Sequence, residues 1–251
     1  MVEGTLSGEK LLSKLIYLIS MQNASNNAQE KALLDFLIEY ITPERKAKFE
    51  KVLDQRTRHI TVVLEDIFQT QNASAVLRSC DLTGIQDVHI IENLNSFDIN
   101  PDVVVGSTKW LNLFKYNQNS FNTLDTFDSL RQKGYRIIAT SPHETGYTPE
   151  DIPLDKPLAL VFGTEKLGLS PEALSNADGF VRIPMVGFTE SYNISVSAAL
   201  LLYSITNRLR KSEVNWQLKN SEREVLMLQW CKNTIKRVEM LEQEFLKRFA
   251  K

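Results

Sequence analysis

The sequence predicts an α/β protein with a parallel sheet flanked by helices, and with helical segments added at both ends of the chain. Two observations support this fold class. Through the middle of the chain, short apolar runs with strand character alternate with helical segments, which is typical of βαβ units. Toward both ends, apolar residues instead recur at helical spacing over longer stretches. We expect a helical extension over 1–57, a main domain over 58–210 and a helical extension over 211–251.

Composition limits the class of protein. The 251 residues are 43% hydrophobic, which is enough for a sizeable core. No apolar run approaches the roughly 20 residues of a membrane span, and no signal peptide is evident, so we expect a cytoplasmic protein without a membrane segment. Cys80 and Cys231 lie far apart and are expected to be reduced. The three histidines do not cluster, so no metal site is expected.

The N-terminal extension reads as three helices. Residues 9–22 and 28–41 carry apolar residues at helical spacing, with a polar turn over 23–27. Thr42 is a suitable N-cap and Pro43 suits the first helical position of the next helix. That helix is basic and runs to about residue 56, so its simplest interpretation is a solvated face and its alternative is a surface for RNA.

The first βαβ unit follows. Residues 60–65 form a buried type of strand, residues 72–84 a helix with Asn72 as N-cap and Gly84 just beyond its end, and residues 87–91 the next strand. Further on, the pattern predicts a turn with a core tryptophan over 106–110, a helix over 124–133 and a strand over 135–140.

The last part of the main domain is organised around two glycine-containing loops that follow strands. Residues 157–162 form a strand, and Ser170 begins a short helix after the loop. Residues 180–183 form a strand that Pro184 ends, and a helix capped by Ser191 or Asn193 follows. Ligands of open α/β sheets bind at the carboxyl ends of strands, so these loops predict a binding site. An amphipathic helix is expected over 222–249.

The charge distribution is uneven, although the formal net charge is only −2. Residues 60–205 hold 9 basic and 17 acidic residues, whereas residues 43–59 hold 6 and 3, and residues 206–251 hold 11 and 6. An acidic centre with basic flanks would suit a protein that holds RNA phosphates at its edges. Ordinary solvated helix faces explain the same pattern, and charge alone favours them.

Three segments resemble the motifs of the SpoU (TrmH) family of SPOUT RNA methyltransferases. The first begins at Asn72 and contains Arg78, the second is Gly-Thr-Glu-Lys-Leu-Gly at 163–168, and the third runs from Ile183 through 200. They occur in family order over about 150 residues. The resemblance implies a C-terminal trefoil knot at about 157–205, which no sequence rule would predict because knots are nearly absent among folds.

The resemblance implies an S-adenosylmethionine-dependent RNA ribose 2′-O-methyltransferase, similar to enzymes that act on a guanosine in the D-loop of tRNA. It also implies a homodimer, for which the small residues at 197–199 would suit close helix packing. The residues that it assigns to catalysis are Arg78, Glu165, Asn193 and Ser195. The residues expected around the cofactor are Thr140, Gly163, Ile183, Met185 and Tyr192. Those expected to contact RNA are Asn72, Arg45, Lys48, Arg58, Arg208 and Arg210.

Other interpretations remain at this point. Tyr192 stands where the family usually has leucine, which could reshape the adenine slot. The substrate could be ribosomal RNA, and a knotted protein could bind RNA without catalysis. Arg78 is often considered a base, but a free guanidinium stays protonated, so we favour a bidentate clamp on an RNA phosphate. A dinucleotide-binding oxidoreductase is disfavoured because no Gly-x-Gly-x-x-Gly follows the first strand.

Overall fold

The computed structural model describes residues 28–97 and 106–249, which form two compact units. The sheet unit comprises Asp54–Leu218. The helical unit combines Met1–Leu53 with Lys219–Lys251, so segments from the two ends of the chain share one unit.

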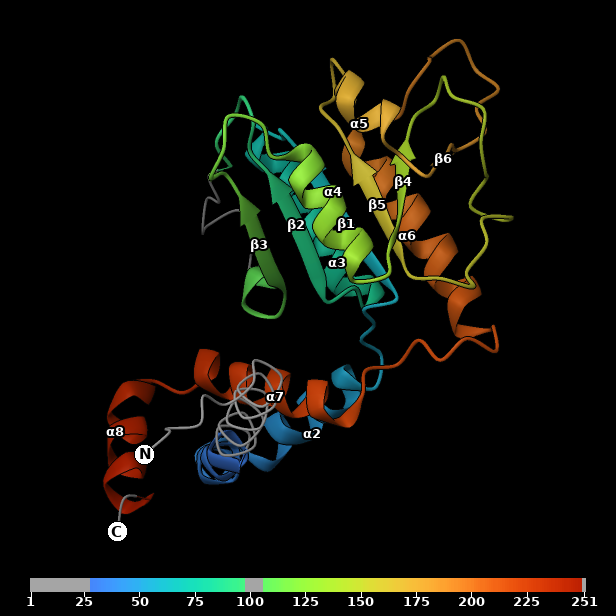
Figure 1. The fold of residues 1–251 in the computed structure, drawn as a ribbon. Helices are drawn as coiled ribbons and strands as arrows, with labels where there is room; N and C mark the ends of the chain where they lie inside the picture. The colour runs from blue at the N-terminus through green and yellow to red at the C-terminus, as the bar shows by residue number, and fades with distance from the viewer. Residues whose placement is uncertain (1–27, 98–105, 250–251) are drawn as a thin grey trace, which may run out of the picture. The chain divides into compact units, whose positions relative to one another are not determined.

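The sheet unit contains six strands, and every pairing between neighbours is parallel (Figure 1). Their order across the sheet is β3-β2-β1-β5-β4-β6. The strands are β1 (Ile60–Glu65), β2 (Asp87–Ile91), β3 (Asn112–Tyr116), β4 (Arg136–Thr140), β5 (Leu158–Phe162) and β6 (Gly179–Val181). Because all strands are parallel, the loops after them open at one edge of the sheet, which we call the carboxyl edge.

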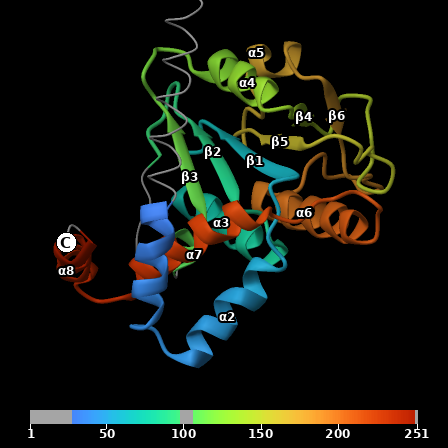
Figure 2. The same cartoon turned by 60° about the horizontal axis from the view of Figure 1, so that its bottom comes forward.

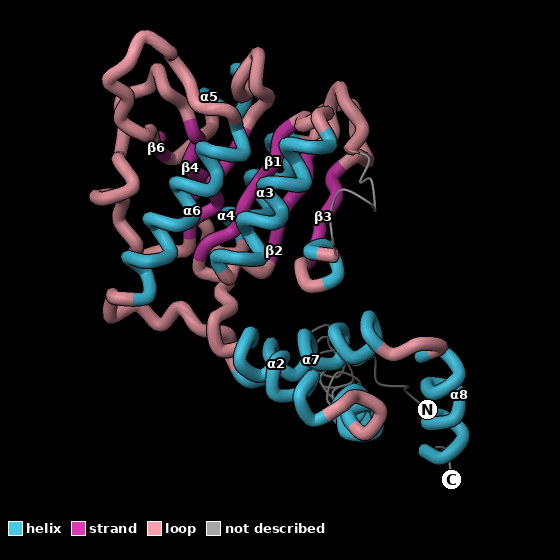
Figure 3. Tube along the Cα trace, turned by 180° about the vertical axis from the view of Figure 1, so that it is seen from behind, coloured by secondary structure: helices cyan, strands magenta, loops and turns pink. Residues whose placement is uncertain are grey.

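Helices cover both faces of the sheet. Helices α3 (Thr70–Thr83) and α6 (Ile194–Arg210) lie side by side over one face, as seen from behind in Figure 3. Helices α4 (Thr123–Gln132) and α5 (Pro171–Ser175) lie over the other face, which Figure 2 shows from the side. The short 3-10 helix η1 (Ser107–Lys109) precedes β3. A larger apolar core lies beneath α3 and α6, and a smaller one lies beneath α4 and α5.

Most predicted boundaries in the sheet unit agree with the structure. The strands at 60–65 and 87–91 are confirmed without change. Gly84 ends α3 in the left-handed conformation, with φ of 83°, and its N–H donates to the carbonyls of Asp81 and Cys80. Asn193 caps α6 by accepting from the backbone N–H of Ser195. Ser170 caps α5 by accepting from that of Ala173.

Two predictions about elements are wrong, and one strand was not predicted. Helix α3 begins at Thr70, so Asn72 lies inside its first turn and is not its N-cap. The strand β3 at 112–116 was not predicted, because its alternating pattern is interrupted by Lys115 and it lies at the edge of the sheet, where burial is incomplete. The long C-terminal helix is divided in two at residues 235–237, where Arg237 adopts a φ of 55°.

The helical unit contains a helix over residues 28–38, α2 (Pro43–Leu53), α7 (Asn220–Thr234) and α8 (Val238–Phe249) among the described residues. The predicted start of α2 is confirmed, since Thr42 Oγ1 accepts from the N–H of Arg45 at 3.2 Å. Phe49 of α2 contacts Trp230 of α7 edge to face, with ring centroids 5.5 Å apart. The predicted helix over 9–22 and the turn over 23–27 lie outside the described residues.

Candidate functional site

A pocket of about 380 Å³ opens at the carboxyl edge of the sheet unit. Three loops contribute to it: the loop after β4, the loop over 163–169 after β5, and the segment between β6 and α6. Helix α6 closes it with Ile194, Ser197 and Leu201. The pocket therefore lies where strands of a parallel sheet present their ends, as the sequence predicts.

The loop over 163–169 is folded tightly on itself. Thr164 and Gly168 exchange two backbone hydrogen bonds, of 2.8 and 3.0 Å. A Cβ atom on Gly163 would lie 2.2 Å from the carbonyl group of Gly168, so no other residue fits at this position. Gly163 was expected beside the cofactor, and the close approach that requires a glycine here is made by the loop itself.

Three residues from the three predicted motifs meet beside this pocket. The carboxylate of Glu165 accepts from the side-chain amide of Asn72 at 3.0 Å and from that of Asn193 at 3.2 Å. The Asn193 amide also donates to Asn72 Oδ1 at 3.1 Å. Asn193 Oδ1 accepts from the backbone N–H of Ser195 at 2.8 Å and from its hydroxyl at 2.5 Å. This polar cluster joins the first turns of α3 and α6 to the loop after β5.

Arg78 lies on α3 and is exposed. No described residue forms a hydrogen bond or an ion pair with its guanidinium group, although Arg56, Arg131, Arg136, Arg208 and Arg210 all have such partners. An exposed guanidinium without an intramolecular partner is available for a ligand, and its planar donors match a phosphate or a carboxylate.

The comparisons with known proteins agree with this geometry. The model of the SpoU rRNA Methylase family matches residues 59–203, which is more than half of the chain. The chain belongs to the SpoU methylase family. The parallel α/β sheet flanked by helices and the methyltransferase class are thereby confirmed at the level of the family.

Relatives of known identity support the same assignment. The tRNA (guanosine(18)-2′-O)-methyltransferase of Borreliella burgdorferi is 45% identical over 206 residues, which is 82% of this chain and 93% of that protein. The enzyme of the same name from Thermus thermophilus is 33% identical over 171 residues, 68% of this chain and 86% of that protein. The crystal structure of the Aquifex aeolicus TrmH/SpoU tRNA modifying enzyme aligns with a TM-score of 0.67 at 27% identity, covering 77% and 98% of the two chains.

A more distant SpoU methyltransferase shares the fold. AviRb from Streptomyces viridochromogenes, whose structure contains AdoMet, aligns with a TM-score of 0.54 at 24% identity. The alignment covers 62% of this chain and 60% of that one. The parallel sheet flanked by helices is thus common to this chain and to solved SpoU proteins.

The five residues predicted to surround a cofactor all line the 380 Å³ pocket of this SpoU protein. They are Thr140, Gly163, Ile183, Met185 and Tyr192. Thr140 does not present its hydroxyl as a free donor, because that group donates to the carbonyl of Val161 at 2.8 Å. Tyr192 remains 45% exposed. The structure brings these residues together, and their contact with a cofactor stays a prediction.

The residues predicted to contact RNA are in different environments. Arg45 and Lys48 are exposed on α2 of the helical unit, whereas Asn72 belongs to the polar cluster. Arg58 pairs with Asp87 at 3.0 Å. Arg208 donates to the carbonyls of Pro149 and Ile152, which fastens the β4–β5 connection to the end of α6. These contacts give Arg58 and Arg208 structural roles, and RNA binding by either of them stays a prediction.

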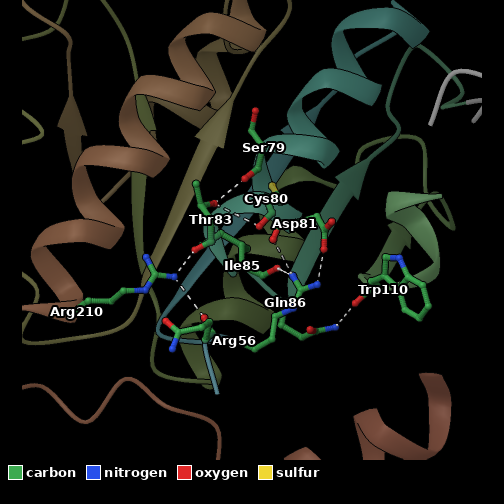
Figure 4. Close-up of polar contacts among 10 residues, drawn as sticks. Arg56, Ser79, Cys80, Asp81, Thr83, Ile85, Gln86, Trp110 and Arg210 are labelled. Carbon is green, nitrogen blue, oxygen red and sulfur yellow. Dashed lines mark hydrogen bonds and ion pairs between the residues drawn. The ribbon is translucent and has the colours of Figure 1, made fainter. Parts of the chain in front are cut away.

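Arg210 also has a structural role. Figure 4 shows its guanidinium donating to the carbonyl of Thr83, a bond of 2.7 Å. The guanidinium also donates to the carbonyl of Gln55 at 3.3 Å. The same group lies over the ring of Trp216, 5.6 Å from its centroid. Arg210 therefore joins the C-terminal end of α3 to the two segments that lead out of the sheet unit.

Sequence reasoning missed Glu65, the last residue of β1. Its side chain is 2% exposed and accepts from the hydroxyl of Thr123 at 2.6 Å, and from the N–H and hydroxyl of Ser170 at 2.9 and 2.8 Å. Ser170 directly follows the loop over 163–169. Glu65 therefore fixes one end of the loop that forms much of the pocket. An acidic residue at the end of an otherwise apolar strand was the available signal.

The described residues contain no group of three or more histidine, cysteine or acidic side chains arranged to hold a metal ion. Within 28–97 and 106–249, no helix is both long enough and apolar enough to cross a membrane.

Proposed function

We propose that this SpoU protein is an S-adenosylmethionine-dependent RNA 2′-O-ribose methyltransferase that acts on guanosine 18, in the D-loop, of tRNA. The observation that carries the proposal is the meeting of Asn72, Glu165 and Asn193 beside the pocket at the carboxyl edge. The names of the relatives from Borreliella burgdorferi and Thermus thermophilus support the substrate.

The pocket suits the proposed cofactor. Phe162, Ile183 and Leu201 provide apolar surface for an adenine ring. The three loops bring backbone amides and carbonyls to the same space, and these can bind the polar edges of a purine. The charged side chains of Lys166 and Glu190 and the imidazole of His143 line the same pocket and can contact the polar tail of a methionine. When bound, S-adenosylmethionine supplies an electrophilic methyl group on a sulfonium sulfur.

The residues of the chain then have separate tasks. The ribose 2′-hydroxyl must be positioned in line with the donated methyl group and must lose its proton. Arg78 is exposed and can hold the adjacent phosphate through two parallel hydrogen bonds, and its positive charge favours the deprotonated hydroxyl. Glu165 and Asn193 hold the loop after β5 against α3 and α6, and so keep the donor and the acceptor sites aligned.

Two further features of the proposal concern architecture. We propose that residues 157–205 form the trefoil knot of the family, which is supported by the convergence of the segments after β5 and β6 on one pocket. We also propose a homodimer through α6. The predicted small-residue face requires correction, because Ala198 is fully buried within the sheet unit.

The exposed face of α6 is apolar and lies on the side of the helix away from Ala198. Val196, Leu200 and Tyr203 are 43, 43 and 67% exposed at the spacing of one helical stripe. A second copy of the chain would cover this stripe. Sedimentation of a Leu200→Glu/Tyr203→Glu variant is expected to give a monomer where the wild type gives a dimer, and a monomeric wild type would exclude the homodimer.

The function is tested by incubating the protein with labelled S-adenosylmethionine and, separately, unmodified tRNA and ribosomal RNA. Methylated ribose is then mapped by the resistance of the neighbouring linkage to alkali. We expect the wild type to label guanosine 18 of tRNA and the Arg78→Ala variant to leave it unlabelled. Label only in ribosomal RNA would overturn the substrate, and failure to bind S-adenosylmethionine would overturn the proposed enzyme.

A further inference from the structure

A second and larger cavity lies entirely within the helical unit. It has a volume of about 630 Å³, compared with about 380 Å³ for the pocket at the carboxyl edge. One wall is formed by residues 40–45, where the chain turns into α2, and the other by residues 234–244, where α7 gives way to α8. A volume of this size lies within the usual range for pockets that hold a small molecule or a nucleotide.

The rim of this cavity is positively charged. Arg45, Lys236 and Arg237 line it, and all three are exposed. The cationic groups of these three side chains have no hydrogen-bond or ion-pair partner among the described residues. The one carboxylate in the lining, Glu244, already pairs with Arg248. Three cationic groups without described partners, around a concave surface, favour an anionic ligand.

The backbone of the rim is unusual. Arg237 has a backbone φ of 55°, a value that residues other than glycine rarely adopt. This conformation interrupts what would otherwise be one long helix and places Lys236 and Arg237 at the mouth of the cavity. Strained positions of this kind persist where the surrounding structure requires them, and they are frequent at binding sites.

The interior of the cavity is apolar and includes an aromatic ring. Ile41, Ile235 and Leu241 contribute aliphatic surface. Tyr40 is 45% exposed and Met240 is 63% exposed, so a flat ligand could pack against both side chains. The ring of Tyr40 is supported by Phe36, with centroids 5.2 Å apart. An exposed aromatic ring beside cationic groups is the usual arrangement for an unstacked nucleobase and its phosphate.

We propose that this cavity binds one unstacked nucleotide of the substrate RNA, with the base against Tyr40 and Met240 and the phosphate held by Arg45, Lys236 and Arg237. This inference rests on the proposed function, because it takes the ligand to be part of an RNA substrate. The cavity is a site for substrate recognition, and the methyl transfer itself uses the residues of the sheet unit.

The phosphate contacts are tested with a Lys236→Ala/Arg237→Gly variant. Glycine adopts a positive φ without cost, so removal of the Arg237 side chain should not unfold the helical unit. The variant is expected to bind unmodified tRNA about tenfold more weakly, and its salt dependence should be less steep by about 0.7 to 0.9 for each lost phosphate contact. Lys247→Ala removes one exposed charge outside the cavity and serves as the control for the loss of a single charge.

The base contact is tested by removing bases one at a time from the tRNA. At one nucleotide, loss of the base is expected to weaken binding by the wild type by about tenfold, as for one base stacked on an aromatic ring. The Tyr40→Leu variant should bind this abasic tRNA and intact tRNA with equal affinity, because it has no aromatic ring for the base to stack on. Tyr40→Phe keeps the ring and should retain the wild-type pattern.

The possible outcomes separate this inference from the proposed function. If the Lys236→Ala/Arg237→Gly variant binds tRNA as tightly as the Lys247→Ala variant, with the same salt dependence, the phosphate site is wrong. If no abasic position distinguishes Tyr40→Leu from the wild type, the base site is wrong. In both cases the proposed function would stand if the wild type still transferred a methyl group to saturating tRNA. If the wild type transferred no methyl group to any tRNA, the proposed function would be contradicted independently of this cavity.

Discussion

The two ends of helix α3 differ in how their polar groups are used. At the end near the carboxyl edge, Asn72 joins a cluster of exposed and partly exposed side chains beside a pocket. At the other end, Arg56 is 1% exposed and pairs with Asp81, and its guanidinium also donates to the carbonyl of Ile85 at 3.0 Å (Figure 4). One helix therefore carries both an open polar site and a closed one.

The comparison is clearest for the two arginines. Burial lowers the pKa of Arg56, and the neighbouring charge of Asp81 opposes that shift. Arg56 contacts Asp81 and the carbonyl of Ile85, both in the sheet unit, so its charge is used for structure. Arg78, on the same helix, is exposed and has no partner among the described residues. Because the guanidinium of Arg78 is not bound within the fold, it is available to contact a substrate.

The largest expected effect comes from Arg78→Lys. Lysine keeps the positive charge but loses the planar pair of donors, so it cannot hold a phosphate through two parallel bonds. We expect turnover on tRNA to fall by about 10²-fold, the usual loss when one preorganised donor at a reacting centre is removed. The melting temperature should not change, because the side chain has no described partner to lose. Turnover near the wild-type value would show that the bidentate contact is wrong.

A second large effect, on stability, is expected at the closed end of α3. Asp81→Ala leaves the buried guanidinium of Arg56 without its counter-charge, which should lower the free energy of unfolding by about 3 kcal/mol. Denaturant unfolding measures this loss, and turnover below the transition should stay near that of the wild type.

The control for Asp81→Ala is Asp128→Ala. Asp128 pairs with Arg131 on the surface of α4, and its side chain is 70% exposed. Loss of such an exposed pair should cost less than about 1 kcal/mol. If the two variants lost the same stability, the burial of Arg56 would not distinguish the two regions.

The sequence was informative where local chemistry determines structure. The start of α2 at Thr42 and Pro43 and the cap of α6 at Asn193 follow from groups within a few residues of one another. The three motifs also identified the residues of the polar cluster, although Asn72 was assigned to RNA and not to a hydrogen bond with Glu165.

The features that the sequence did not show depend on contacts between distant segments. The roles of Arg208 and Arg210 depend on carbonyls that lie 56 to 155 residues away in the chain. The sequence identifies Arg208 and Arg210 as positively charged residues but does not indicate which carbonyls they contact. The break at Arg237 left the apolar periodicity of 222–249 almost unchanged, so a single helix was expected. The bonds of Glu65 span 58 and 105 residues and were equally invisible.

The smallest expected effect concerns Glu65, which acts on the pocket at the carboxyl edge through its contacts with Ser170. In Glu65→Gln an amide replaces one of the two acceptor oxygens, so one of the two bonds to Ser170 is lost or reversed. The loop over 163–169 would then be held more weakly at the end that leads into α5. We expect the KM for S-adenosylmethionine to rise about tenfold, the equivalent of one charge-assisted hydrogen bond, with a smaller change in kcat.

A purely structural role of Glu65 would lower the melting temperature without this separation of KM and kcat. Glu92→Gln provides the comparison, because Glu92 also accepts several hydrogen bonds near the carboxyl edge but contacts Phe97, Lys115 and Asn117 rather than the loop over 163–169. Its KM for S-adenosylmethionine should match that of the wild type. Equal KM values for the two variants would mean that Glu65 stabilises the fold without positioning the loop. The polar contacts of Glu65 at the carboxyl edge would then be structural, as those of Arg56 are at the opposite end of α3.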